Sequence, residues 1–178
     1  MPTVPVDDVP WFPIIMLRRV LPEPSPDERA LSVGALEQLC TAMRDAGYRF
    51  AALSEVMRRL DAQEHIDRLA CLTFDHGFAD FAEHAAPLLT RLEVPATVCL
   101  VSDHLGGDDG WARERGRPPV PMLTAAQVQE LRLQGFELGS QSATHPWLTP
   151  LGAEQQRDEL VRSKETLEQL LEQRVDTF

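Results

Sequence analysis

The sequence lacks an excess of basic residues, and this absence limits the partners that it can bind. Its 178 residues include 17 Lys and Arg against 28 Asp and Glu, which gives a net charge of −11. Contacts with nucleic-acid phosphates need clustered Lys and Arg, so we expect no nucleic-acid partner. The same negative charge disfavours anionic membrane surfaces and strongly acidic glycans.

Cysteine pairs and long apolar runs are also missing. Cys40, Cys71 and Cys99 are far apart, form no C-x-x-C pattern and are odd in number, which predicts reduced thiols and no disulfide framework. No run approaches the roughly 18 apolar residues of a membrane helix, and no signal peptide is visible at the N-terminus. We therefore expect a cytoplasmic protein without membrane contact, built as a single domain over residues 1–178, with residues 1–10 as an irregular arm.

Apolar segments alternate between strand and helix patterns along the chain. Hydrophobic residues make up 43% of the sequence, enough for a substantial core. Strands are predicted over 11–20, 69–74, 96–101, 136–138 and 175–178. Helices are predicted over 32–47, 54–63, 80–92 and 124–134, with another starting at Thr149-Pro150. The run at 69–74 is apolar without alternation, as in a parallel strand covered on both faces. The pattern predicts an α/β fold with parallel strands.

Two polar segments follow predicted strands directly. The first is Thr-Phe-Asp-His-Gly at 73–77, and the second is Gly-Ser-Gln-Ser-Ala-Thr-His-Pro at 139–146. In folds with parallel strands, functional groups gather at the carboxyl ends of the strands. We therefore expect Asp75 and His76 to face Gln141 and His145 across one pocket.

These segments resemble two motifs of the polysaccharide deacetylase family, also called the NodB-homology family or carbohydrate esterase family 4. The family motifs read T-F-D-D-G and H-[ST]-x-x-H, and the resemblance extends from about Ile14 onward. It implies a (β/α) barrel of the polysaccharide deacetylase type. The barrel is expected to be incomplete at its C-terminal end, because the later family motifs have no counterpart here. The implied function is hydrolysis of carbon–nitrogen, non-peptide amide bonds in N-acetylated carbohydrate.

The resemblance also implies a role for each motif position. Asp75 matches the general base and His145 matches the last metal ligand. His76 stands in place of an Asp ligand, and Gln141 in place of the first His. Imidazole binds zinc well, whereas a neutral amide oxygen is a weak ligand. A divalent metal such as zinc, held by His76, His145 and weakly by Gln141, is therefore one hypothesis. The other is an inactive pseudoenzyme that binds a glycan or a partner protein without turnover.

Three further residues are candidates for substrate binding. Arg18 lies in the segment 17–20 at the end of the first predicted strand, at the position where the family often has a His. Trp147 follows the second motif and either stacks on a sugar ring or fills an apolar gap, and the same alternatives apply to Trp111. His104 lies in the long loop 102–121 and is a candidate for the rim of the site. The ligand implied is a carbohydrate or another N-acylated small molecule.

Two expectations concern surfaces. Arg113, Arg115 and Arg117 are interspersed with acidic residues, which is typical of a solvated loop. An incomplete barrel would leave a strand edge exposed, and an exposed edge can pair with a second copy. We therefore expect a homodimer formed through the exposed sheet edge.

Overall fold

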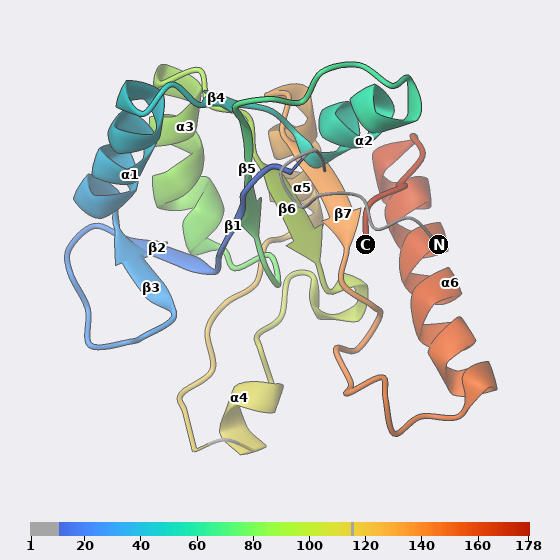
Figure 1. Cartoon of the computed structure of the whole chain (residues 1–178). Helices are drawn as coiled ribbons and strands as arrows, with labels where there is room; N and C mark the ends of the chain where they lie inside the picture. Colours follow the sequence, from blue (N-terminus) through green and yellow to red (C-terminus); the bar gives the residue numbers. More distant parts are fainter. Residues whose placement is uncertain (1–10, 115) are drawn as a thin grey trace.

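The computed structural model describes residues 11–114 and 116–178, so the irregular arm predicted for residues 1–10 lies outside the described part. Within these residues, five parallel strands form the central sheet (Figure 1): β1 (Ile14–Leu17), β4 (Arg49–Phe50), β5 (Leu69–Phe74), β6 (Thr97–Leu100) and β7 (Glu137–Ser140). The order is β1-β5-β6-β7, and β4 pairs with the first residues of β5. This confirms the predicted α/β fold with parallel strands.

The strand registers align the carboxyl ends of β1, β5, β6 and β7 at the same end of the sheet. Leu17 of β1 lies opposite Phe74 of β5, and Leu100 of β6 lies opposite Ser140 of β7. Every residue of β5 is buried, as its uninterrupted apolar run predicted. The two polar segments identified in the sequence therefore both begin at the carboxyl ends of the strands.

Helices flank this sheet (Figure 1). Their bounds are α1 (Val33–Asp45), α2 (Leu53–Asp61), α3 (Ala86–Arg91), α4 (Trp111–Glu114), α5 (Ala125–Leu133) and α6 (Ala153–Leu171). A π-helical turn (Phe81–Ala85) precedes α3, and a 3₁₀ turn (Ser102–His104) follows β6. Two short parallel strands, β2 (Arg19–Leu21) and β3 (Ala30–Ser32), form a second sheet beside α1. No helix in the described residues has the length and hydropathy needed to cross a bilayer.

Local capping signals located two of the helix starts correctly. Ser32 caps α1 by accepting a hydrogen bond from the Ala35 amide, and Thr124 forms a capping box with Gln127 at the start of α5. The start predicted for α6 at Thr149-Pro150 is wrong, because α6 begins at Ala153. Residues 148–151 instead form a turn whose carbonyls at 148 and 151 accept hydrogen bonds from the Gln156 side chain.

The two edges of the sheet differ. Residues 175–178, predicted to be a strand, form no regular strand, but the Thr177 carbonyl accepts a hydrogen bond from the Ser140 amide. A Cβ atom on Gly139 would lie 3.1 Å from that carbonyl oxygen, so the glycine permits this close approach. At the other edge, β1 carries Ile14 and Met16, whose exposed fractions are 50% and 51%.

Candidate functional site

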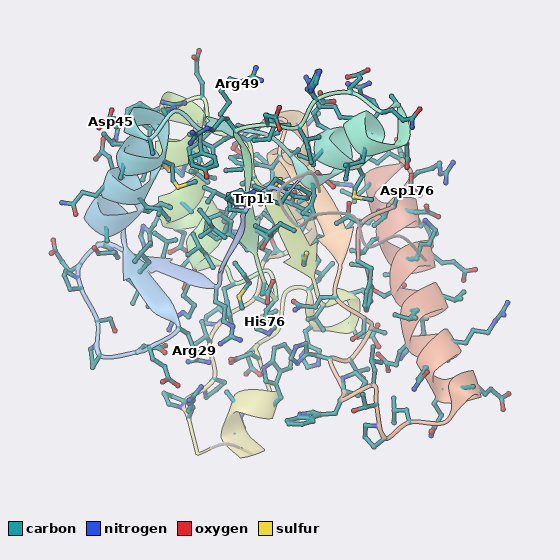
Figure 2. The ribbon with its side chains drawn as sticks, in the orientation of Figure 1. Trp11, Arg29, Asp45, Arg49, His76 and Asp176 are labelled. Carbon is teal, nitrogen blue, oxygen red and sulfur yellow. The ribbon has the colours of Figure 1, made fainter. Side chains whose placement is uncertain are left out.

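A cavity of about 320 Å³ lies at the carboxyl ends of the strands, and we call it the strand-end cavity. It is lined by Arg18, Arg29, Asp75, His76, Phe78, Trp111, Ala112, Arg117, Gln141, His145, Pro146 and Trp147. Figure 2 shows His76 beyond the ends of the strands, on the side of the sheet where α4 lies. The structure therefore places both motifs on one cavity, as expected from their positions directly after two predicted parallel strands.

A sharp turn after β5 directs the first motif into the cavity. His76 and Gly77 both have left-handed backbone conformations, with φ of 77° and 80°. A Cβ atom on Gly77 would lie 2.6 Å from Cδ2 of the buried Leu100 and would displace that side chain, so both the contact and the left-handed φ favour glycine here. A left-handed histidine is uncommon and needs support from its surroundings.

Gln141 provides part of that support. Its Oε1 atom accepts a hydrogen bond of 2.6 Å from the backbone amide of His76. Its side chain also hydrogen-bonds the Asp75 carboxylate. Gln141 therefore links the two motifs directly. The oxygen that would be its metal-binding atom already accepts a short hydrogen bond.

Asp75 lies at the centre of this arrangement. Burial raises the pKa of its carboxyl above the ordinary value, while the hydrogen bond from Gln141 and the positive charge of Arg18 partly oppose the rise. A carboxylate with a raised pKa binds protons more readily than a solvated one. Asp75 is therefore suited to accept a proton inside the cavity.

The two histidines pack together under an indole ring. The ring centroids of His76 and His145 are 4.6 Å apart, and that of Trp111 is 4.5 Å from His145 and 5.7 Å from His76. Trp111 belongs to α4, in the long loop between β6 and α5. The loop thus supplies one wall of the cavity.

A buried carboxylate on α6 holds the loop that carries His145. Oε2 of Glu159 accepts hydrogen bonds from the backbone amides of Ala143 and Thr144, at 2.9 and 2.8 Å. Oε1 accepts a third from the Thr144 hydroxyl, at 2.8 Å. Burial alone would raise the pKa of Glu159. The hydrogen bonds from Thr144 and Ala143 and the charge of Arg162 together outweigh burial, so the pKa is lower than its ordinary value. The His145 loop is therefore fixed by an ionised carboxylate.

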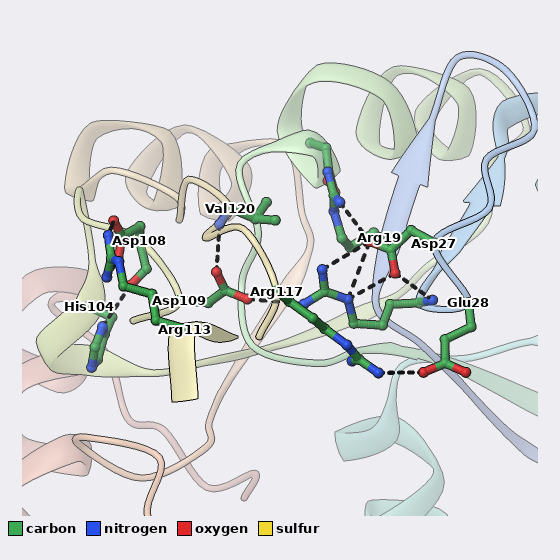
Figure 3. Close-up of polar contacts among 11 residues, drawn as sticks. Arg19, Asp27, Glu28, His104, Asp108, Asp109, Arg113, Arg117 and Val120 are labelled. Atoms are coloured by element: carbon green, nitrogen blue, oxygen red, sulfur yellow. Dashed lines mark hydrogen bonds and ion pairs between the residues drawn. The ribbon is translucent and has the colours of Figure 1, made fainter. Parts of the chain in front are cut away.

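An alternating series of charges holds the opposite wall (Figure 3). Arg29 pairs with Asp27 at 2.9 Å and with the fully buried Asp109 at 3.1 Å. Asp109 also accepts a hydrogen bond of 2.5 Å from the Val120 amide, and Arg19 pairs with Asp27 at 2.9 Å. The hydrogen bond from Arg29 is the main cause that holds the pKa of Asp27 far below its usual range. This network ties the long loop to the loop between β2 and β3.

The arginines of the long loop differ in position. Arg113 pairs with Asp108 at 2.6 Å on the surface, as expected for a solvated loop. Arg117 instead lines the strand-end cavity and pairs with Glu28 at 2.6 Å. Arg115 lies outside the described residues.

The three candidates for substrate binding, Arg18, Trp147 and His104, occupy different positions relative to the strand-end cavity. Arg18 lines the cavity directly after β1. Trp147 also lines it, with an exposed fraction of 74%, so its ring is available at the mouth. His104 lies beside Trp111, with ring centroids 4.9 Å apart, and its Nδ1 atom is 2.8 Å from the Asp108 carbonyl oxygen. His104 thus contacts a residue of the cavity wall.

The donor set does not fit a resident metal ion. Catalytic zinc sites use three protein ligands. Within residues 11–114 and 116–178, no group of three or more His, Cys, Asp or Glu side chains is arranged to hold a metal. Gln141 does not fill the gap, because a neutral amide oxygen is a weak ligand for zinc and this one already accepts the His76 amide hydrogen. The arrangement joins two imidazoles and one carboxylate without the geometry of a metal centre.

Comparison with known proteins agrees with this architecture. The family model for polysaccharide deacetylase matches residues 62–178. The chain belongs to the polysaccharide deacetylase family. YxkH of Bacillus subtilis, whose name assigns it to the polysaccharide deacetylases, is 24% identical over 132 residues. The alignment covers 74% of this deacetylase-family chain and 43% of YxkH, so the chain spans less than half of that relative.

Solved deacetylases share the fold. The Streptococcus pyogenes deacetylase PplD, solved with acetate, is 26% identical, with a TM-score of 0.77 over 94% of this chain and 72% of PplD. IcaB from Ammonifex degensii is 20% identical, with a TM-score of 0.78 over 92% of this chain and 71% of IcaB. These matches confirm the predicted NodB-type fold, and this chain spans about seven-tenths of each solved relative.

Sequence reasoning missed four residues of the site: Arg29, Arg117, Trp111 as a neighbour of both histidines, and Glu159. A signal existed for Glu159, because it opens the segment 159–164 that resembles the family. The other three come from loops, whose folded positions depend on contacts distant in sequence. Arg29 pairs with Asp109 and Arg117 pairs with Glu28, and each of these ion pairs joins residues far apart in the sequence, which no local pattern specifies.

Proposed function

We propose that the strand-end cavity binds an N-acetylated carbohydrate and that the chain hydrolyses its carbon–nitrogen amide bond. The observation that carries this proposal is the position of Asp75 and His145. Their loops follow different strands, and both side chains line one cavity of about 320 Å³. That volume lies within the range of small-molecule sites.

In this proposal Asp75 accepts the proton of the attacking water. Burial raises the pKa of its carboxyl toward neutral pH, which makes it a better proton acceptor. The hydrogen bond from Gln141 holds the carboxylate in place. Trp147 offers a flat apolar face for a sugar ring at the cavity mouth. Amide hydrolysis also requires stabilisation of an oxyanion. Because the described side chains form no three-ligand metal centre, we expect turnover to be slow.

A second function is favoured by one observation. Gln141 stands at a motif position where the family has a metal-binding His, and its Oε1 atom, a weak metal ligand, accepts a hydrogen bond of 2.6 Å from the His76 amide. A site built in this way supports binding without turnover. The alternative is therefore a carbohydrate-binding pseudoenzyme that uses the same cavity.

One experiment separates the two functions. Acetate release from an N-acetylated chito-oligosaccharide is measured beside calorimetric binding of the same compound, for the wild type and for Asp75→Asn. Asp61→Asn, an exposed carboxylate on α2, is the matched control. Acetate release that Asp75→Asn abolishes and Asp61→Asn preserves supports the hydrolase. Binding without acetate release supports the pseudoenzyme, and the absence of both rejects the two proposals.

We also propose a cytoplasmic homodimer that pairs through β1. The supporting observation is that Ile14 and Met16 of this edge strand are half exposed. Light scattering at high protein concentration tests the assembly, and a monomeric mass would contradict it. Met16→Lys should lower any dimer affinity, because it places a charge at the edge.

A further inference from the structure

Arg18 differs from the other two arginines of the strand-end cavity. Arg29 is held by two carboxylates, those of Asp27 and Asp109, and Arg117 is held by Glu28. Within the described part of the chain, the Arg18 guanidinium forms no ion pair and no hydrogen bond, and its Nε atom is buried. Among the described residues, Arg18 is therefore a cavity guanidinium whose donors no other group uses.

Asp75 is the acidic residue whose pKa Arg18 affects, but it does not form an ion pair with Arg18. The charge of Arg18 lowers the pKa of Asp75, but the two side chains form no ion pair. The Asp75 carboxylate accepts its hydrogen bond from Gln141 instead. Arg18 thus keeps both its charge and its donors, while the base of the proposed reaction has a separate partner.

A guanidinium in this state matches one class of ligand group. Its planar set of N–H donors fits the paired oxygens of a carboxylate or phosphate, and its positive charge attracts an anion. The partly enclosed cavity reduces screening by water, which strengthens such a pair. A neutral hydroxyl would use one donor and leave the charge uncompensated.

We propose that Arg18 binds an anionic substituent, a carboxylate or a phosphate, on the N-acetylated sugar that the cavity accepts. This inference rests on the proposed function and adds the substrate class to it. The net charge of −11 still disfavours a polyanionic chain approaching from solution. A single anionic group is repelled much less than a polyanion, and inside the cavity it lies beside Arg18. The ligand class is therefore a sugar with one anionic group at or beside the N-acetylated ring.

A matched set of three sugars tests this proposal. N-acetylglucosamine is neutral, its uronic acid carries a carboxylate at C6, and its 6-phosphate carries a phosphate at the same carbon. Calorimetry measures the affinity of each for the wild type, Arg18→Gln, Arg18→Lys and the control Arg157→Gln, which changes an exposed arginine on α6. Circular dichroism checks that each variant is folded.

The wild type and Arg157→Gln should bind at least one anionic sugar tenfold or more tighter than the neutral sugar. Arg18→Gln should abolish this preference, so that the variant binds neutral and anionic sugars with equal affinity, and Arg18→Lys should keep part of it, because the charge remains without the planar fork. The relative affinities of the uronic acid and the phosphate identify which anion the cavity accepts. Equal affinities for neutral and anionic sugars in the wild type, or a preference that survives Arg18→Gln, would overturn the proposal.

Inorganic phosphate alone separates this inference from the proposed function. Phosphate binding that depends on Arg18, without binding of any sugar, would retain the anion site and reject the carbohydrate function. Binding of the neutral sugar without any Arg18-dependent anion effect would do the reverse. In that case Arg18 acts only as the charge that lowers the pKa of Asp75, and Arg18→Gln would shift only the pH profile of acetate release.

Discussion

Removal of the Glu159 carboxylate tests whether α6 fixes the loop that carries His145. In Glu159→Ala the backbone amides of Ala143 and Thr144 lose their acceptor, and so does the Thr144 hydroxyl. Glu159 and Ala143 are both buried, so water replaces the carboxylate incompletely. The variant therefore leaves at least one buried donor poorly satisfied.

The cost follows from these contacts. A buried donor left without a partner costs about 1–3 kcal/mol, and two amides lose their partner here. Partial entry of water into the vacated space offsets some of that, so we expect the free energy of unfolding to fall by about 3 kcal/mol. Glu159→Gln retains an oxygen for the amides of Ala143 and Thr144, so its cost should be about 1 kcal/mol.

Urea denaturation followed by circular dichroism measures the global effect, and amide hydrogen exchange at Ala143 and Thr144 measures the local one. Glu165→Ala is the control, because Glu165 is an exposed residue of the same helix. The control should change the free energy of unfolding by less than about 0.5 kcal/mol. Equal stability of Glu159→Ala and Glu165→Ala, with unchanged exchange at both amides, would refute the proposed role of Glu159.

The same carboxylate predicts a pH dependence. The pKa of Glu159 is lower in the folded protein than its ordinary value, so the folded state favours its ionised form. Its contribution is therefore fully present above the unfolded pKa and is lost as the pH falls through the folded pKa. The stability difference between the wild type and Glu159→Ala should be constant near neutral pH and shrink in acid. A difference that grows in acid would contradict this sign.

Three further predictions concern the strand-end cavity and its walls. If Asp75 is the base, acetate release should rise with pH through a range above the ordinary aspartate pKa. Arg18→Gln should move that rise to higher pH, because it removes a charge that lowers the pKa of Asp75. The same pH profile in Arg18→Gln and the wild type would count against Asp75. The double variant His76→Asp with Gln141→His should bind zinc in calorimetry at least tenfold more tightly than the wild type, and no gain would mean that the two loops cannot form one metal site. Asp109→Asn should lower the free energy of unfolding by about 3 kcal/mol in urea, since it weakens a fully buried ion pair, and a loss below about 1 kcal/mol would show that the pair contributes little.

Local sequence signals predicted most of the secondary structure. The apolar run of β5, the Ser32 cap of α1 and the Thr124–Gln127 capping box depend on neighbouring residues, so they could be identified without the fold. The start of α6 was misplaced because proline at 150 suggested a first helical turn, whereas the Gln156 side chain stabilises a turn there.

The sequence alone also determined where the two motifs lie. Parallel strands have their carboxyl ends at the same end of a sheet. Asp75 and His145 therefore had to lie at that end once both strands were identified. What the motif residues do within the cavity was decided by tertiary contacts. The bond from the His76 amide to Gln141 joins positions far apart in the chain, and the packing of Trp111 on both imidazoles depends on a loop held by buried ion pairs. Such contacts depend on distances across the fold, which local patterns in a single sequence do not specify.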